Sequence, residues 1–370
     1  MSKSKASVLK SLMKKLPDGS VYTLDDEKEY GAVQTGISTL DYATGIGGFP
    51  RNKMTLVYGT ASTGKTAMVL QTIGNYQKSN PDSMAAVIDL EDSMTIDWAK
   101  KFGINPENLL IVKPTDVEEM ITMTMECVKA KVFDVIVVDS LGAGLLRSEL
   151  DNDKSRMAGS AGAVTRMVKA INSAFIELKR EERIAESNGD DTSDFVFPAV
   201  VLINQARQDM NSMYGGITYS GGKALTHMMS IIIQLKRINA TAEKIEGTVD
   251  GVKMRVGWLC SATIEKNKLA TPGKSAGYAF IFKECPEYEF GIDNARSVSD
   301  LSIVTGIARV EGKTIYYPTP DGEAKVVGRN NYVKALKDES LCQYIAEIIS
   351  KDMSSNIEDP DLEIVKEINS

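Results

Sequence analysis

Residues 59–66 read Gly59-Thr60-Ala61-Ser62-Thr63-Gly64-Lys65-Thr66, which is a complete G-x-x-x-x-G-K-[ST] phosphate loop. The apolar run at residues 54–58 before it is typical of a short buried strand, and the run at residues 67–73 after it is typical of a helix. The order strand, glycine loop, helix distinguishes a nucleotide site from a chance match in a turn. The stretch therefore predicts an α/β fold that binds a nucleoside triphosphate.

Each residue type in this loop has a chemical reason to be there. Gly59 and Gly64 permit backbone angles that a Cβ would forbid, so that backbone N–H groups can wrap a phosphate at the start of a helix. We expect Lys65 to reach the β- and γ-phosphates of ATP and the Thr66 hydroxyl to bind Mg²⁺. The residues expected to contact the nucleotide are Gly59, Thr60, Ala61, Ser62, Thr63, Gly64, Lys65, Thr66 and Ala67.

Two further strands are predicted to end in acids beside this loop. Residues 133–140 form an apolar strand that ends in Asp139, which we expect to hold Mg²⁺ through its water shell. Residues 85–91 form another, and a carboxylate at its end can orient the water that attacks the γ-phosphate. We assign this catalytic role to Glu91, with Asp89 and Asp92 as competing candidates and a solvated strand-end acid as the alternative.

The composition excludes several classes of protein. The chain has 370 residues, 43% of them hydrophobic, and a net charge of -7, so it is not coated in basic surface. It shows no secretory signal, no long apolar stretch and no CxxC spacing among its four cysteines, and its single histidine rules out most histidine-based chemistry. We therefore expect a cytoplasmic protein with reduced thiols, no membrane contact and no zinc site.

Strand-like and helix-like runs alternate along most of the chain, which predicts an α/β fold with a mainly parallel twisted sheet flanked by helices. The later strands follow one another closely, as in antiparallel hairpins at a sheet edge. A polar stretch at 181–194 is expected to be an exposed loop or mobile insertion. The predicted segments are 1–34 (a short helix at 7–16 and a linker), 35–290 (the core), 291–352 (a small C-terminal α/β domain) and 353–370 (an acidic-leaning flexible tail).

Ordered blocks along the chain resemble the bacterial RecA recombinases. The blocks follow one another as residues 36–50, the phosphate loop, residues 88–91, 134–140, 202–207, 220–225 and 265–268. The resemblance extends from about residue 7 to 290 and more loosely to about 335. It implies a RecA-type ATPase core, and it assigns to Gln205 the sensing of the γ-phosphate, because Gln205 ends the matching strand and leads into a DNA loop.

The resemblance also implies assembly. RecA-like subunits stack head to tail in a helical filament, because contacts between unlike surfaces do not close. The N-terminal helix would dock on the next subunit, and Lys266 and Lys268 would reach into a neighbour's ATP site, where a cation stabilises transition-state charge. Their spacing puts both lysines on one face of an extended strand, and a solvated pair of edge-strand lysines is the alternative.

Adenine recognition departs from the family pattern. RecA proteins usually carry an acid and a tyrosine around the base, whereas this chain has Thr95 and Trp98. Trp98 can still stack on a purine, or it can serve only as packing bulk for a helix.

Two loops, roughly residues 149–160 and 208–221, are implied to bind DNA. They are rich in small polar residues, and a residue from each, best matched by Met157 and Met210, would insert between base triplets unless these methionines merely anchor the loops. DNA binding through local charge is expected to weaken steeply with salt. The implied DNA-contacting residues are Arg147, Lys154, Arg156, Met157 and Arg166 near the first loop, and Arg207, Met210, Met213, Tyr214, Gly221, Gly222 and Lys223 in or near the second.

The resemblance thus predicts an ATP-dependent DNA recombinase that forms a filament on single-stranded DNA and exchanges strands with a homologous duplex. ATP and Mg²⁺ are the expected cofactors. Single-stranded and double-stranded DNA, further copies of the chain, and single-strand-binding and mediator proteins are the expected partners. The alternatives are a ring helicase or motor of the same fold, a mediator that loads a recombinase, and a small-molecule kinase, which shares only the phosphate loop.

Overall fold

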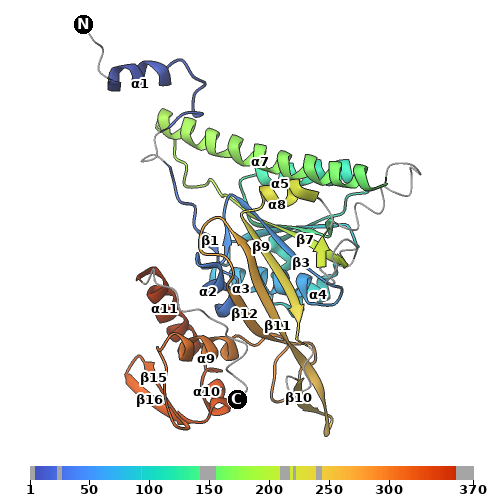
Figure 1. The fold of residues 1–370 in the computed structure, drawn as a ribbon, viewed down its shortest axis with the longest axis vertical. Helices are drawn as coiled ribbons and strands as arrows, with labels where there is room; N and C mark the ends of the chain where they lie inside the picture. Colours follow the sequence, from blue (N-terminus) through green and yellow to red (C-terminus); the bar gives the residue numbers. More distant parts are fainter. Residues whose placement is uncertain are drawn as a thin grey trace.

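One large sheet runs through the computed structural model (Figure 1). The structure describes residues 5–22, 27–92, 94–141, 156–208, 217–219, 222–238 and 244–355. Within them the sheet has eleven strands, and its main path is β13-β12-β11-β9-β3-β7-β6-β4-β5. Their bounds are β3 Lys53–Gly59, β4 Met84–Asp89, β5 Leu109–Val112, β6 Phe133–Asp139, β7 Ala199–Gln208, β8 Ile217–Tyr219, β9 Ile231–Arg237, β10 Lys244–Val249, β11 Val252–Asn267, β12 Ser275–Ile281 and β13 Gly291–Ile292.

The strand directions confirm the predicted mainly parallel sheet with antiparallel strands at one edge. The six strands from β9 to β5 are parallel, and β11, β12 and β13 add to them in antiparallel register. β10 folds back on β11 as a hairpin that extends away from the core (Figure 1). Because the parallel strands all end at the same edge of the sheet, their terminal side chains converge there.

Helices cover both faces of the sheet. α2 (Ser38–Thr44), α3 (Lys65–Ser79) and α4 (Ile96–Lys101) bury apolar residues in one core, and α5 (Val117–Lys129), α7 (Arg156–Asn188) and α8 (Gly222–Met228) do so in the other. The second group lies together on one side of the sheet in Figure 1. The result is the three-layer α/β/α arrangement that alternating strands and helices produce.

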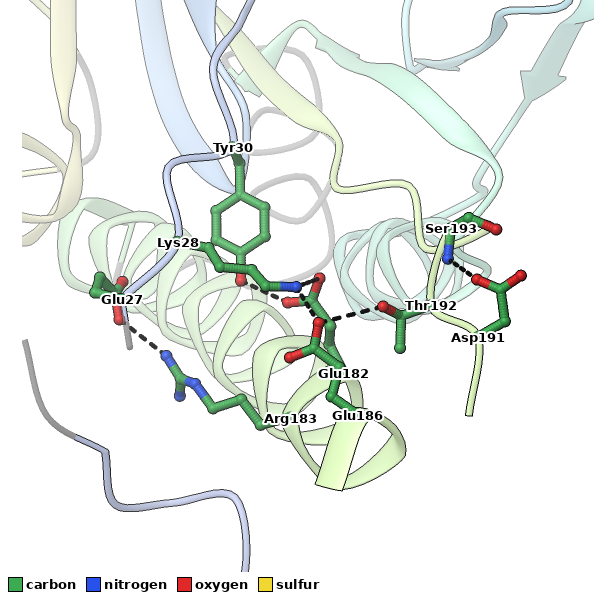
Figure 2. A network of polar contacts seen from close by, with 9 residues as sticks. All are labelled: Glu27, Lys28, Tyr30, Glu182, Arg183, Glu186, Asp191, Thr192 and Ser193. Carbon is green, nitrogen blue, oxygen red and sulfur yellow. Dashed lines mark hydrogen bonds and ion pairs between the residues drawn. The ribbon is translucent and has the colours of Figure 1, made fainter. Parts of the chain in front are cut away.

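The stretch 181–194 was predicted to be a loop, and this prediction is wrong as far as residue 188. α7 continues through it, because the stripe of buried residues that includes Ile171 and Leu178 extends to Glu182, which is only 5% exposed. The Glu182 carboxylate accepts hydrogen bonds from Lys28 Nζ at 3.0 Å and from Tyr30 Oη at 2.7 Å (Figure 2). A polar residue thus occupies a buried helical position because the chain near residue 28 supplies its partners.

Smaller elements lie at the two ends of the chain. α1 (Lys5–Met13) lies apart from the sheet, and β1 (Ala32–Val33) pairs with β2 (Phe49–Pro50) where the chain enters the core (Figure 1). After β13, the chain forms α9 (Asn294–Val304), a three-stranded sheet of β14 (Arg309–Glu311), β15 (Thr314–Thr319) and β16 (Gly322–Val327), then α10 (Arg329–Ala335) and α11 (Glu339–Ser355). These C-terminal elements enclose an apolar core of their own around Leu301 and Tyr332. The four-segment division of the chain stays a prediction, and its tail from residue 356 lies outside the described residues.

Candidate nucleotide-binding site

The phosphate loop connects the carboxyl end of β3 to the first turn of α3. Gly64 adopts a left-handed conformation with φ +87°, which glycine tolerates without strain. A Cβ on Gly59 would meet the carbonyl oxygen of Leu235 at 2.4 Å, so β9 packs too closely for any larger residue there. Glycine is therefore required at the two positions for different reasons. Gly64 adopts a left-handed backbone angle, and Gly59 leaves room for the close approach of β9.

Lys65 lies folded against its own loop. Its ammonium donates hydrogen bonds to the carbonyl oxygens of Gly59 at 3.1 Å and Thr60 at 2.9 Å, and the residue is 8% exposed. Burial lowers the pKa of Lys65, while the charges of Asp139 and Glu91 act in the opposite direction. A cation enclosed by loop carbonyls is suited to exchange them for phosphate oxygens.

A hydroxyl and a carboxylate meet at the start of α3. Thr66 Oγ1 donates to Asp139 Oδ2 at 2.6 Å. Burial raises the pKa of Asp139 to about 6, and the Thr66 hydrogen bond opposes this shift. Oxygen donors of this kind suit Mg²⁺, which usually keeps several waters and takes only one or two ligands from the protein. The structure thus brings together the two residues that the sequence predicted for the metal.

The turn after β4 places a second carboxylate, Glu91, beside the turn after β6. Glu91 Oε1 accepts a hydrogen bond from Ser140 Oγ at 2.7 Å and from Gln205 Nε2 at 3.3 Å. Gln205 lies directly opposite Gly59 in the register of β7 and β3. The sequence had no role for Ser140, although its place directly after Asp139 was a usable signal.

The competing acids at this strand end have other partners. Asp89 accepts the backbone N–H groups of Glu91 at 3.2 Å and Met94 at 2.8 Å, and it is 3% exposed, so it shapes the turn. Asp92 forms an ion pair with Lys113. Of the three acids, Glu91 is thus the one whose carboxylate contacts Ser140 and Gln205.

The region predicted for adenine contains an aromatic cluster. Thr95 caps α4 by accepting the Trp98 N–H at 3.2 Å, so this residue has a structural role. The Trp98 ring is half-buried and packs edge-on against Phe102, with ring centres 5.1 Å apart, and against Phe290 at 5.8 Å. Trp98 thus packs α4 against its neighbours, and a ring packed at its edge can still offer a face to a purine.

Lys266 and Lys268 lie at the opposite edge of the sheet from the loop. Lys266 pairs with Ile232, near the start of β9, whereas the loop residue Gly59 pairs with Leu235 at the end of the paired stretch. At a rise of about 3.3 Å per residue the two positions are about 10 Å apart along the strand. Both ammonium groups donate to the last carbonyls of α8, Lys268 to His227 at 2.8 Å and Lys266 to Thr226 and to His227. The structure does not bring them to the loop of the same chain.

The predicted DNA loops are only partly described. The first was expected to extend to residue 160, but α7 begins at Arg156, so its last residues are helical. The second contains β8, which pairs with the end of β7. Arg166 is exposed on α7 and forms an ion pair with Glu118 of α5. The other predicted DNA residues lie outside the described residues (Arg147, Lys154, Met210, Met213, Tyr214, Gly221) or in elements whose side chains are not described there (Arg156, Met157, Arg207, Gly222, Lys223).

Two negative findings apply to the described part of the chain. None of its helices has the length and apolar character to span a bilayer. It also contains no cluster of three or more histidine, cysteine or acidic residues able to hold a metal ion by themselves. A metal at Thr66 and Asp139 would accordingly depend on water and on the phosphates of a nucleotide for its remaining ligands.

Comparison with known proteins gives one consistent result. The family described as the RecA N-terminal domain matches residues 3–286. The RecA protein of Thermotoga maritima is 30% identical over 91% of this chain and 88% of its own length. That of Chloroherpeton thalassium is 29% identical over 93% and 88%, and that of Pseudarthrobacter chlorophenolicus is 27% identical over 98% and 94%.

Proposed function

The chain belongs to the RecA family and is an ATP-dependent recombinase, and on this premise we propose that it works by assembling head to tail on single-stranded DNA and hydrolysing ATP at the junctions between copies. The observation that carries the proposal is the separation of Lys266 and Lys268 from the phosphate loop of their own chain. The ammonium groups are held by carbonyls of α8 and not at their own loop, and head-to-tail stacking would bring them to the phosphate site of a second molecule.

The residues at the carboxyl edge support an ATPase. Lys65 would leave the carbonyls of Gly59 and Thr60 to bind the β- and γ-phosphates, and Asp139 and Thr66 would hold Mg²⁺. When bound, Mg²⁺ supplies positive charge next to the phosphate oxygens. Glu91 would accept a hydrogen bond from the attacking water and orient it, because phosphoryl transfer depends mainly on positioning and charge.

Gln205 provides a connection between nucleotide and DNA. Its amide donates to Glu91, and β7 continues from it to residue 208, where the predicted second DNA loop begins. We propose that a γ-phosphate draws Gln205 away from Glu91 and thereby shifts the strand that leads into the loop. A differential contact of this kind is what a ligand needs in order to change affinity elsewhere.

The neighbouring copy would complete the site. Lys266 and Lys268 would exchange the α8 carbonyls for the phosphates of the adjacent subunit's ATP, so hydrolysis depends on assembly. Burial and the charge of Lys268 lower the pKa of Lys266, so an anion would relieve an unfavourable pair. ATP binding would then stabilise the DNA-competent filament, and hydrolysis would release it.

Strand exchange between matched duplexes changes the free energy only slightly. The duplex formed is about as stable as the duplex lost, at roughly 1.4 kcal/mol of stacking per step, so the filament needs only to align the strands and lower the barrier. We propose the cytoplasm as the location, with single-strand-binding and mediator proteins as further partners. The free thiols of the four cysteines are compatible with that compartment.

The test measures ATP hydrolysis with and without single-stranded DNA, followed by pairing of that strand with a homologous duplex. We expect DNA-stimulated hydrolysis, ATP-dependent joint molecules and filaments in electron micrographs. Rings in the micrographs would favour a helicase instead. DNA binding without hydrolysis would favour a mediator.

A further inference from the structure

A basic cavity lies at the amino edge of the sheet, away from the phosphate loop. Its volume is about 300 Å³, which is at the lower end of the range for small-molecule sites. Four cationic side chains line it: Lys53 from the start of β3, and Lys179, Arg180 and Arg183 from α7. Ser20 and Tyr22 close another side, and they belong to residues 17–22 and 27–30, which we call the N-terminal strap.

The cations of this cavity exceed the carboxylates that face them. Glu27 pairs with Lys179 at 2.6 Å and with Arg183 at 2.9 Å. Arg180 donates through Nε to the neutral carbonyl of Asp18 at 2.7 Å. Among the residues that the structure describes, four cations and one carboxylate leave a net three positive charges around the cavity. Such an excess is costly in a partly buried place unless an anion offsets it.

Lys53 is the cation with the least compensation. Among the described residues, no acid pairs with it, although it is partly buried. Burial lowers the pKa of Lys53, the charges of Lys179 and Lys268 lower it further, and Glu27 partly opposes them. A bound anion would therefore interact most strongly with this side chain.

The strap that covers the cavity is held to α7 by charge. Figure 2 shows Lys28 reaching Glu182 and Glu186, and Glu27 reaching Arg183. The Arg183 guanidinium also lies over the Tyr22 ring, 3.4 Å from its centre. Arg183 of α7 thus contacts both the cavity and the segment that connects α1 to the core.

We propose that this cavity binds a small phosphate-bearing anion, such as pyrophosphate or the polyphosphate of a free nucleotide, at a site separate from the phosphate loop. Lys53 contributes its uncompensated ammonium, and the Arg180 and Arg183 guanidinium groups offer the paired donors that suit phosphate oxygens. The bound anion bridges β3, α7 and the strap. It therefore orders the chain that leads to α1.

A compact polyanion fits the cavity better than a single carboxylate does. Its two to four negative charges match a net three positive charges, whereas one carboxylate leaves two unbalanced. A DNA backbone phosphate is the other source of this chemistry. The strap residues on one side and α7 on the other favour a compact anion over a continuous strand.

The test titrates inorganic pyrophosphate into the full-length Lys65→Ala variant by calorimetry, since that background removes the main cation of the phosphate loop. We expect binding to one site per chain, weakened at least tenfold by Lys53→Met and unchanged by Lys253→Met, an exposed lysine on the distant β10–β11 hairpin. Hydrogen exchange of amides 18–22 should slow with pyrophosphate in the Lys65→Ala chain and not in the Lys65→Ala/Lys53→Met double variant.

The folded state provides an internal control. Lys53→Met removes an uncompensated charge, so the melting temperature without anion should stay the same or rise, while the rise caused by pyrophosphate disappears. If the Lys65→Ala chain and the Lys65→Ala/Lys53→Met double variant bind pyrophosphate with equal affinity, the proposal is overturned. The absence of pyrophosphate binding combined with weaker oligo-dT binding by Lys53→Met would also overturn it, because the cavity would then serve DNA.

Discussion

The two edges of the parallel sheet differ in how their charges are balanced. At the carboxyl edge, each charged group has a partner within the chain: Lys65 has loop carbonyls, Asp139 has Thr66, and Glu91 has Ser140 and Gln205. At the amino edge, Lys266 and Lys268 have only neutral carbonyls of α8, and Lys53 has no acid among the described residues.

This difference in charge makes the two edges of the sheet complementary to each other. One edge presents carboxylates and a loop shaped for phosphate. The other presents Lys53, Lys266 and Lys268, which pair with no acid among the described residues. Unlike surfaces that complement each other join copies head to tail and do not close into a dimer. Under our two proposals, the amino edge would have two anion partners, a neighbour's nucleotide at Lys266 and Lys268 and a free anion in the basic cavity.

The largest expected effect tests whether the two edges of the sheet meet between copies of the chain, and the experiment mixes two inactive variants. Lys266→Ala should lower DNA-stimulated ATP hydrolysis by about 10³–10⁵-fold, the range for cations supplied across an interface, without loss of ATP binding. Lys65→Ala should be inactive because it cannot hold the phosphates. In an equal mixture, random head-to-tail junctions should restore about a quarter of the activity, because a Lys266→Ala protomer then offers its loop to a Lys65→Ala neighbour.

The control is each variant mixed with itself at the same total concentration. If the mixture is no more active than its components, the two edges do not meet across a junction. The lysines would then be a solvated pair at the edge of the sheet.

The second prediction tests whether Glu91 is the acid that acts at the carboxyl edge. Glu91→Gln should lower ATP hydrolysis by about 10²–10⁴-fold, the range for loss of a positioned base, while ATP binding is retained. Asp92→Asn is the matched control, since Asp92 lies on the same turn and pairs with Lys113 outside the site. Equal losses in both variants would count against the assignment.

The third prediction uses pH to measure how much the burial of Asp139 lowers the free energy of unfolding. The pKa of Asp139 is raised to about 6 by burial, so its contribution to stability is present at low pH and is lost as pH rises through 6. Without nucleotide, Asp139→Asn should therefore increase the free energy of unfolding by about 2–3 kcal/mol at pH 8 and by little at pH 4. Urea denaturation at both pH values measures the difference, and a constant difference would contradict it.

The smallest expected effect concerns the strap at the amino edge. Glu182→Gln weakens the contact with Lys28 and Tyr30 and should cost about 1–2 kcal/mol, since one partner is partly exposed. Tyr30→Phe removes one hydrogen bond to the same carboxylate and should cost about 1 kcal/mol. Chemical denaturation of the full chain checks both values. A negligible loss in Glu182→Gln would mean that apolar packing alone holds the strap.

The sequence predicted the elements whose signals are local. The strands predicted around the site, at residues 54–58, 85–91 and 133–140, are present as β3, β4 and β6. Thr66, Asp139, Glu91 and Gln205 lie together as parallel strand ends require. The polar end of α7 was missed because composition alone does not show that Glu182 finds a partner in Lys28, more than 150 residues away. Ser140 was missed for the same reason, since its partner Glu91 lies in the turn after another strand, β4.

What the sequence determined by itself is the chemistry of the loop and the order of strands and helices. Glycine angles, strand alternation and helical stripes depend on neighbours along the chain. Only the tertiary structure decided that the paired lysines lie on the edge away from their own loop, and that cations from β3 and α7 enclose a cavity under the strap. Strand register and helix packing set these distances, and both depend on contacts between residues far apart in the chain.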